Sequence, residues 1–312
     1  MTTTSIRVLA TLSAALTLSL GVDATQAPEA QIQQTFHSSV DLVTIQASVR
    51  DGRGRPMKGL TPSDFEIRDN GQLRPILSLH ADLRSPVSLA IMVDMSGSMR
   101  VGSKIAMARQ AFESLLTQLR DGEDEVALIT FDSALHERTG FTRDLATLRG
   151  GLAEFEPFGT TSLYDATAAT ARRLAARPST HKAIIVLTDG IDTSSTLNAA
   201  EVSGLASSID VPVYVVATVP SVDQRAMMEG ADHASRSNSA DLRDLAAWTG
   251  GQFVFASTFT ETIVAASSLV DGLRQQYVLA IEAAEAHEWR RLDIRVKHPT
   301  AIVKARSGYF GG

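Results

Sequence analysis

The chain of 312 residues contains no cysteine. Without thiols it can form no disulfide, zinc–cysteine site, iron–sulfur cluster or thiol nucleophile. It also lacks an excess of positive charge, since 29 Lys and Arg residues stand against 35 Asp and Glu residues, a formal net charge of −6. Broad nucleic-acid binding needs a basic face, so this balance argues against nucleic acid as a partner. The proportions of hydrophobic residues (44%) and charged residues (21%) exclude a wholly disordered, collagen-like or coiled-coil protein.

Long apolar runs are scarce, and the first lies at the N-terminus. Val8 to Val22 is apolar or small and follows a single charge at Arg7. A basic start, a short apolar stretch and small residues before the cut are typical of a secretory signal, here residues 1–24 with cleavage after Ala24. The alternative is an uncleaved anchor, but the run of about 15 residues is shorter than the roughly 20 that span a bilayer. We expect an exported protein, periplasmic or secreted, with no transmembrane segment in the mature chain.

Antiparallel β structure is predicted for residues 36–84, after a flexible polar leader over residues 25–35. From Val43 to Val49, apolar side chains alternate with polar ones, as in a strand with one buried face. Asp69-Asn70-Gly71 is typical of a β-hairpin, because Asn and Gly tolerate the positive φ of a type I′ turn.

The pattern changes in residues 85–275, where apolar runs alternate with helical patterns. We interpret as strands the runs 87–93, 126–131, 183–187, 211–217 and 253–256, and as helices the segments 105–119, 162–176, 199–207, 241–248 and 259–275. Continuous apolar runs suit strands buried on both faces, as in a parallel sheet. The prediction is an α/β domain with a doubly wound, mostly parallel sheet. Residues 219–240 show no clean period, and we interpret them as a loop.

The period-two pattern returns in residues 276–312, where Tyr277, Leu279 and Ile281 alternate with polar or smaller residues. The two flanks could form one smaller β-sandwich with the α/β domain inserted between them. Alternatively, each flank could pack on the α/β domain by itself. We favour the single sandwich, because isolated hairpins are marginally stable in water.

Oxygen-bearing side chains follow the ends of two predicted parallel strands. Asp94 ends the first strand and is followed by Ser96 and Ser98, whereas Asp189 follows a later one and Thr161 precedes a helix. Ligands of open parallel sheets bind beyond the carboxyl ends of the strands. Two carboxylates and three hydroxyls, without histidine, suit Mg²⁺ or Mn²⁺ better than zinc. The acidic run from Asp121 to Glu125 lacks the spacing of a calcium loop and is interpreted as a solvated turn before a strand.

The proposed metal residues resemble the metal-ion-dependent adhesion site of von Willebrand factor type A (VWA) domains. The matching motifs are Asp94-Met-Ser96-Gly-Ser98, Gly159-Thr-Thr161-Ser-Leu163 and Asp189-Gly190. Thr160 stands where the family commonly has glycine. The flanks also resemble the bacterial VWFA-related family, through Gly59-Leu-Thr-Pro-Ser-Asp-Phe65, Thr249-Gly250-Gly251 and Arg306-Ser-Gly-Tyr309.

This resemblance implies a Rossmann-like fold and a role for each matched residue. Ser96, Ser98 and Thr161 would contact the metal through hydroxyls, and Asp94 and Asp189 would act directly or through water. Such sites typically bind a partner protein whose Glu or Asp completes the metal coordination. The resemblance therefore implies an adhesion or scaffold protein rather than an enzyme.

An enzymatic alternative is a Mg²⁺-dependent phosphotransferase of the haloacid-dehalogenase type, with Asp94 as nucleophile. That chemistry needs a second carboxylate two residues further on as a general acid, and this chain has Ser96 there. A serine hydrolase is disfavoured as well, because no Gly-x-Ser-x-Gly segment occurs. We therefore expect a non-enzymatic binding protein.

Overall fold

The computed structural model describes residues 42–82, 85–179, 181–208, 210–219, 233–284 and 287–310. The expected signal peptide and leader, residues 1–35, lie outside this range. Within it, no helix is both long and apolar enough to cross a membrane.

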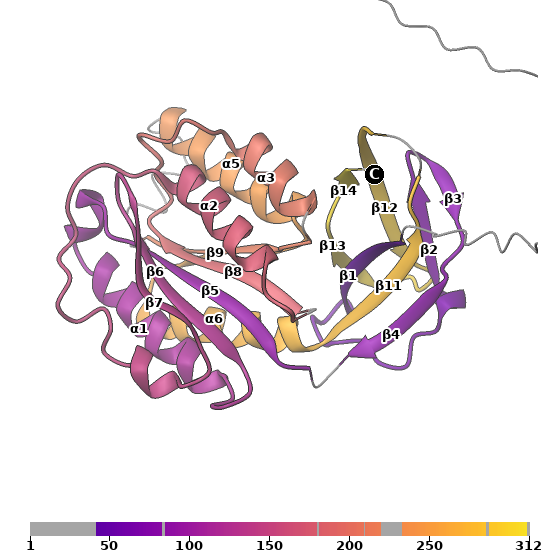
Figure 1. Ribbon diagram of the computed structural model, residues 1–312, viewed down its shortest axis with the longest axis horizontal. Helices are drawn as coiled ribbons and strands as arrows, with labels where there is room; N and C mark the ends of the chain where they lie inside the picture. The colour runs from indigo at the N-terminus through magenta and orange to yellow at the C-terminus, as the bar shows by residue number, and fades with distance from the viewer. Residues whose placement is uncertain are drawn as a thin grey trace, which may run out of the picture. The chain divides into compact units, whose positions relative to one another are not determined.

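A six-stranded sheet forms the α/β domain (Figure 1). Its strands are β5 (Val87–Asp94), β6 (Glu125–Phe131), β7 (Leu135–Thr142), β8 (His181–Thr188), β9 (Val213–Thr218) and β10 (Phe253–Ala256). Their order is β10-β9-β8-β5-β6-β7, and every pair is parallel except β6 with β7. The central strand β5 is buried at every residue, which is why its sequence is apolar on both faces.

Helices cover both faces of this sheet (Figure 1). On one side lie α1 (Lys104–Gln118) and α6 (Phe259–Arg274), and on the other α2 (Leu163–Ala175), α3 (Ala199–Ser208) and α5 (His233–Trp248). Leu89 and Ile91 of β5 belong to the core beneath α1 and α6, whereas Ala90 and Met92 belong to the opposite core. The predicted doubly wound α/β architecture is thus confirmed.

Two elements differ from the sequence-based expectation. The strand β7 was not predicted, because it lies at the sheet edge and is only partly buried, so its sequence lacks an apolar run. The helix α5 begins at His233 rather than at Asp241, within the segment interpreted as a loop. That first half is rich in serine, a mediocre helix former, so its sequence predicts no helix although the backbone forms one.

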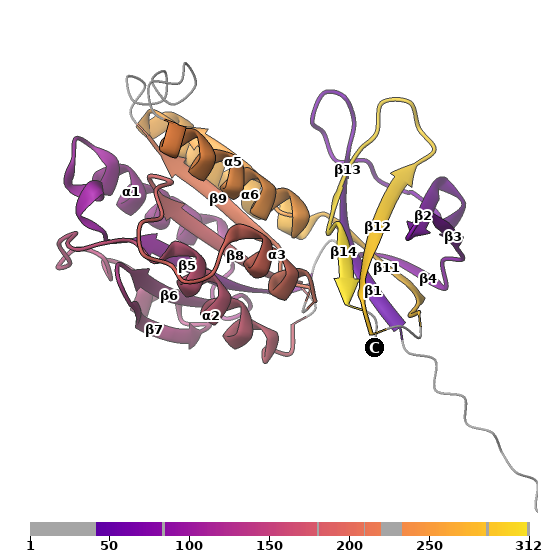
Figure 2. The ribbon, with the colours of Figure 1, turned by 90° about the horizontal axis from the view of Figure 1, so that it is seen from above.

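The flanking segments form two further sheets, and each contains strands from both ends of the chain (Figure 2). One has the order β13-β1-β11-β4, from β13 (Ile302–Ala305), β1 (Leu42–Arg50), β11 (Gln276–Glu282) and β4 (Ser78–Asp82). The other has the order β14-β12-β2-β3, from β14 (Gly308–Phe310), β12 (Trp289–Val296), β2 (Phe65–Asp69) and β3 (Gln72–Arg74). Ile45, Ile67 and Leu279 meet in one shared core, fully buried. The single composite sandwich is therefore the arrangement found.

The buried carboxylate of Asp69 joins strands from the two flanks. It accepts hydrogen bonds from the Arg290 Nε (2.7 Å) and the Tyr309 hydroxyl (3.0 Å), and it pairs with Arg74 (3.3 Å). Asp69 also opens the predicted hairpin, in which Asn70 and Gly71 have φ of 47° and 83°. A carboxylate that is 0% exposed needs such partners, because an unpaired buried charge is costly.

Close backbone contacts join the sandwich to the α/β domain within the compact unit formed by residues 40–312. The Arg306 guanidinium donates to the carbonyls of Ser207 (2.5 Å) and Thr44. Beside it, Thr249 forms a backbone bridge with Arg306, and Gly250 is required by packing, since a Cβ there would lie 2.6 Å from the Arg306 backbone nitrogen. Thr249 and Gly250 thus serve this junction, whereas Gly251 packs inside the α/β domain, where a Cβ would lie 2.0 Å from the Val213 carbonyl oxygen.

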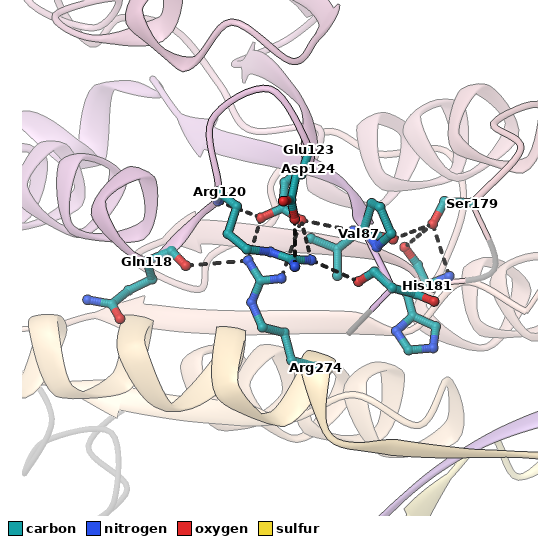
Figure 3. A network of polar contacts seen from close by, with 10 residues as sticks. Val87, Gln118, Arg120, Glu123, Asp124, Ser179, His181 and Arg274 are labelled. Carbon is teal, nitrogen blue, oxygen red and sulfur yellow. Dashed lines mark hydrogen bonds and ion pairs between the residues drawn. The ribbon is translucent and has the colours of Figure 1, made fainter. Parts of the chain in front are cut away.

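Residues 121–124 of the acidic run form a turn before β6, as predicted, but the turn is not wholly solvated: the carboxylate of Asp124 is buried and organises the amino ends of the strands (Figure 3). Asp124 accepts hydrogen bonds from the backbone of Val87 (3.1 Å) and Arg120 (2.6 Å) and pairs with Arg274. These partners come from β5, from the turn after α1 and from the end of α6. This network therefore fixes the amino ends of the strands, which lie at the end of the sheet opposite to Asp94.

Candidate metal centre

The predicted metal residues lie at the switch point of the sheet. The chain passes from β5 to β6 on one side and later returns to β8 on the other, so β5 and β8 are neighbours with Val93 opposite Leu187. Asp94 ends β5, and Asp189 directly follows β8. Their carboxylates therefore emerge at adjacent carboxyl ends, where open α/β sheets bind ligands.

Asp94 is 0% exposed and has protein partners on both oxygens. Its Oδ1 accepts the backbone N–H of Ser96 (2.9 Å), and its Oδ2 accepts the Thr188 hydroxyl (2.6 Å). Burial, and then the negative charge of Asp189, raise the pKa of Asp94 to about 7. The centre thus holds more negative charge than its protein surroundings neutralise.

The two serine hydroxyls lie side by side in the loop after β5. Ser96 Oγ and Ser98 Oγ are 3.1 Å apart, with Ser96 buried and Ser98 half-buried. A short 3₁₀ helix, η2 (Gly97–Arg100), begins between them. The backbone N–H of Gly97 donates to the Gly159 carbonyl (2.9 Å), which brings the loop of Thr161 against the serine loop.

Thr161 is buried and is fixed by the loop that follows Asp189. Its backbone N–H donates to the Thr193 hydroxyl, and its carbonyl accepts the N–H groups of Thr193 and Ser194, all at 2.9 Å. The Asp192 carboxylate accepts the N–H of Leu163 (2.7 Å), at the first turn of α2. The loops of Thr161 and Asp189 are therefore one connected unit.

Asp189 carries a contact that the sequence did not predict. Its Oδ2 accepts a hydrogen bond from the Lys104 Nζ at 3.0 Å, and both side chains are buried. Its Oδ1 is buried without a hydrogen-bond partner in the part of the chain that the structure describes. Lys104 is the first residue of α1, and nothing in the sequence around it indicates this ion pair.

The donor set fits a hard divalent cation. Buried oxygen acceptors are hydrogen-bonded as a rule, so the unpartnered Asp189 Oδ1 marks a place for a cation or its water. Across the described residues no three His, Asp, Glu or Cys side chains converge, so a metal here depends on the hydroxyls of Ser96, Ser98 and Thr161. All-oxygen coordination of low charge is the preference of Mg²⁺ and Mn²⁺.

Comparison with known proteins places the α/β domain in a family. Residues 89–191 match the model of the von Willebrand factor type A domain. A von Willebrand factor type A protein from Catenulispora acidiphila has a similar fold, with a TM-score of 0.51 and 14% identity over 87% of this chain and 74% of that one. Proximal thread matrix protein 1 from the mussel byssus, in a structure with a zinc-occupied MIDAS motif, has a TM-score of 0.50 and 16% identity.

The matched solved structures differ in how much of each chain the similarity covers. The match to the mussel protein spans 65% of this chain and 50% of the mussel chain. The protein BatB from Bacteroides thetaiotaomicron is covered completely by 61% of this chain, at 18% identity and a TM-score of 0.47. No curated protein sequence matches the chain. The match over residues 89–191, together with the shared fold, shows that the chain contains a von Willebrand factor type A domain.

Proposed function

We propose that this protein is an exported, non-enzymatic adhesion or scaffold protein that binds a partner protein through a divalent cation. Asp94, Ser96, Ser98, Thr161 and Asp189 would hold Mg²⁺ or Mn²⁺ at the carboxyl ends of β5 and β8. The observation that carries this proposal is the buried Asp189 Oδ1, which has no hydrogen-bond partner among the described residues, together with Asp94, whose negative charge is disfavoured by burial and by Asp189. The zinc-occupied motif of the mussel protein, on a similar fold, supports it.

The residues of this chain would prepare the cation site in advance. The Ser96 N–H and the Thr188 hydroxyl orient Asp94, and Lys104 fixes Asp189 through Oδ2 and leaves Oδ1 without a partner among the residues that the structure describes. Such outer contacts orient metal ligands and tune their strength. The bound cation would supply a positive centre able to accept an outside oxygen. A Glu or Asp of the partner protein is the group we propose for that position.

Exposed apolar side chains near the candidate centre support a protein as the partner. Phe158 is 77% exposed, and its backbone N–H donates to the Met95 carbonyl (2.7 Å) in the loop between Asp94 and Ser96. Val101, which directly follows η2, is 62% exposed. Aromatic side chains are frequent anchors of protein interfaces. We propose that the acidic residue of the partner is flanked by apolar residues that contact Phe158 and Val101.

An enzymatic role is not proposed. In a phosphotransferase, Asp94 would need a general acid beside it, and the neighbouring position holds Ser96, whose Oγ contacts Ser98. Both Asp94 oxygens are engaged by Ser96 and Thr188, which leaves the carboxylate oriented for binding rather than attack. We expect no hydrolysis of phosphoesters by the wild-type protein.

Export through cleavage after Ala24 is part of the proposal and has its own test. The intact mass of the protein recovered from the exported fraction should correspond to a chain that begins at Thr25. A protein that retains Met1 and partitions into membranes would contradict the exported, soluble form.

The binding proposal is tested by capture of partners from the exported fraction with Mg²⁺ or with EDTA. Asp94→Asn removes a carboxylate of the centre, whereas Asp144→Asn removes an exposed carboxylate elsewhere. We expect one set of proteins to be captured by wild type and Asp144→Asn in Mg²⁺, and to be lost with EDTA or Asp94→Asn. If the same proteins are captured in EDTA, and also by Asp94→Asn, as by wild type in Mg²⁺, the binding does not depend on the metal and the proposal is contradicted.

A further inference from the structure

A buried cation, Lys104, is built into the candidate metal centre. Lys104 is 7% exposed, and its Nζ lies 3.0 Å from Asp189 Oδ2. No other Lys or Arg among the described residues forms an ion pair with Asp94 or Asp189. The ammonium group is thus part of the charge balance of the centre.

This ammonium changes the charge that the loaded centre presents to a partner. Two carboxylates alone would neutralise a divalent cation, so the loaded centre would carry no net charge. With Lys104 beside Asp189, the same centre holds one positive charge more than its carboxylates offset. In a partly buried site an uncompensated charge interacts far more strongly with an incoming ion than it would in water.

We propose that Lys104 gives the metal-loaded centre a net positive charge and thereby selects a partner group with one negative charge, a carboxylate. This inference rests on the proposed function and adds a specificity-determining residue outside the metal ligands. It has two opposite consequences. The ammonium repels the incoming cation, so metal binding is weaker than the ligands alone would allow. It attracts the carboxylate, so partner binding is stronger.

Three variants separate charge from position. Lys104→Gln removes the charge and keeps a donor for Asp189, whereas Lys104→Arg keeps the charge. Lys182→Gln is the matched control, since Lys182 is a half-buried lysine of β8 whose Nζ donates to the Ala175 carbonyl (2.9 Å). The probes are Mn²⁺ alone and then acetate added to the Mn²⁺-loaded protein at constant ionic strength. Calorimetry measures Mn²⁺ binding, and water-proton relaxation measures displacement of Mn²⁺-bound water by acetate.

The expected result is a pair of shifts in opposite directions. Lys104→Gln should bind Mn²⁺ about tenfold more tightly and acetate about tenfold more weakly, the size expected for one unit charge near such a site. Lys104→Arg and Lys182→Gln should resemble wild type in both titrations.

Other patterns would overturn the inference. If Lys104→Gln weakens both Mn²⁺ and acetate binding, or changes neither, Lys104 only positions Asp189 or has no effect, while the proposed function stands. If wild type binds no Mn²⁺ and Lys104→Gln does, the ammonium replaces the metal, and the proposed function fails together with the inference. If no variant binds Mn²⁺, both fail as well.

Discussion

Replacement of Asp94 by asparagine should stabilise the metal-free protein at alkaline pH, although it removes a residue of the proposed centre. The carboxylate is 0% exposed and lies near Asp189, so its ionised form is disfavoured in the folded chain. Asparagine has nearly the same shape without the charge. Its amide oxygen can accept the Ser96 N–H, and its amide nitrogen can donate to the Thr188 hydroxyl oxygen.

The magnitude and the sign follow from the pKa of Asp94, which rises from 3.8 to about 7 on folding. The folded state binds this proton more tightly than the unfolded state does. Below pH 3.8 the protonated carboxyl therefore contributes its full stabilisation of the folded state. This stabilisation falls as the pH rises from 3.8 to about 7, and it is lost at higher pH. At about 1.4 kcal/mol per pKa unit, the loss approaches about 4 kcal/mol. Asp94→Asn does not incur this loss, so it should exceed wild type by about 1–4 kcal/mol at pH 8 and by much less at pH 5.

Urea unfolding followed by circular dichroism, in EDTA at pH 5 and pH 8, measures this difference. The control is Asp144→Asn, whose exposed carboxylate should give the same stability as wild type at both pH values. If Asp94→Asn is no more stable than wild type at pH 8, or gains the same amount at both pH values, then the Asp94 charge does not destabilise the fold and the reasoning is wrong.

Three other outcomes are expected. Truncation after Arg274 should remove the hydrogen-exchange protection of Leu42–Arg50, because β1 pairs with β11 and β13; protection that survives would mean that the N-terminal flank folds independently. Asp69→Ala should lower the free energy of unfolding by about 3–5 kcal/mol in urea, because it leaves the buried Arg290 with only the exposed Glu288 as an ionic partner; a loss below about 1 kcal/mol would contradict this. Phe158→Ser should leave Mn²⁺ affinity and thermal stability unchanged and weaken partner capture, and undiminished capture would exclude Phe158 from the interface.

The architecture was predictable wherever burial dictates composition. The fully buried β5 has an apolar sequence from Val87 to Val93, and the period-two flanks of the sandwich follow from one buried face per strand. The edge strand β7 pairs on one side only, so no apolar run marks it. The position of β7 is set by its backbone pairing with β6, and the sequence of β7 does not indicate this pairing.

The candidate centre was predictable to the extent that its residues stand in short motifs. Asp94, Ser96 and Ser98 lie within one loop, and Asp189 follows a recognisable strand. Lys104 stands 85 residues before Asp189, and a lysine at the start of a helix is ordinarily solvated, so nothing in its sequence context indicated an ion pair. Such partners depend on how α1 packs beside β8, which only the tertiary structure shows.

The central claim is that this VWA domain binds a divalent cation through Asp94. Isothermal titration calorimetry with Mg²⁺ and with Mn²⁺, on wild type, Asp94→Asn and Asp144→Asn at pH 8, tests it most directly. We predict saturable binding of one cation per chain by wild type and Asp144→Asn, and no saturable heat with Asp94→Asn. Wild-type protein that shows only heats of dilution with both metals, or Asp94→Asn that binds as wild type does, would contradict the account.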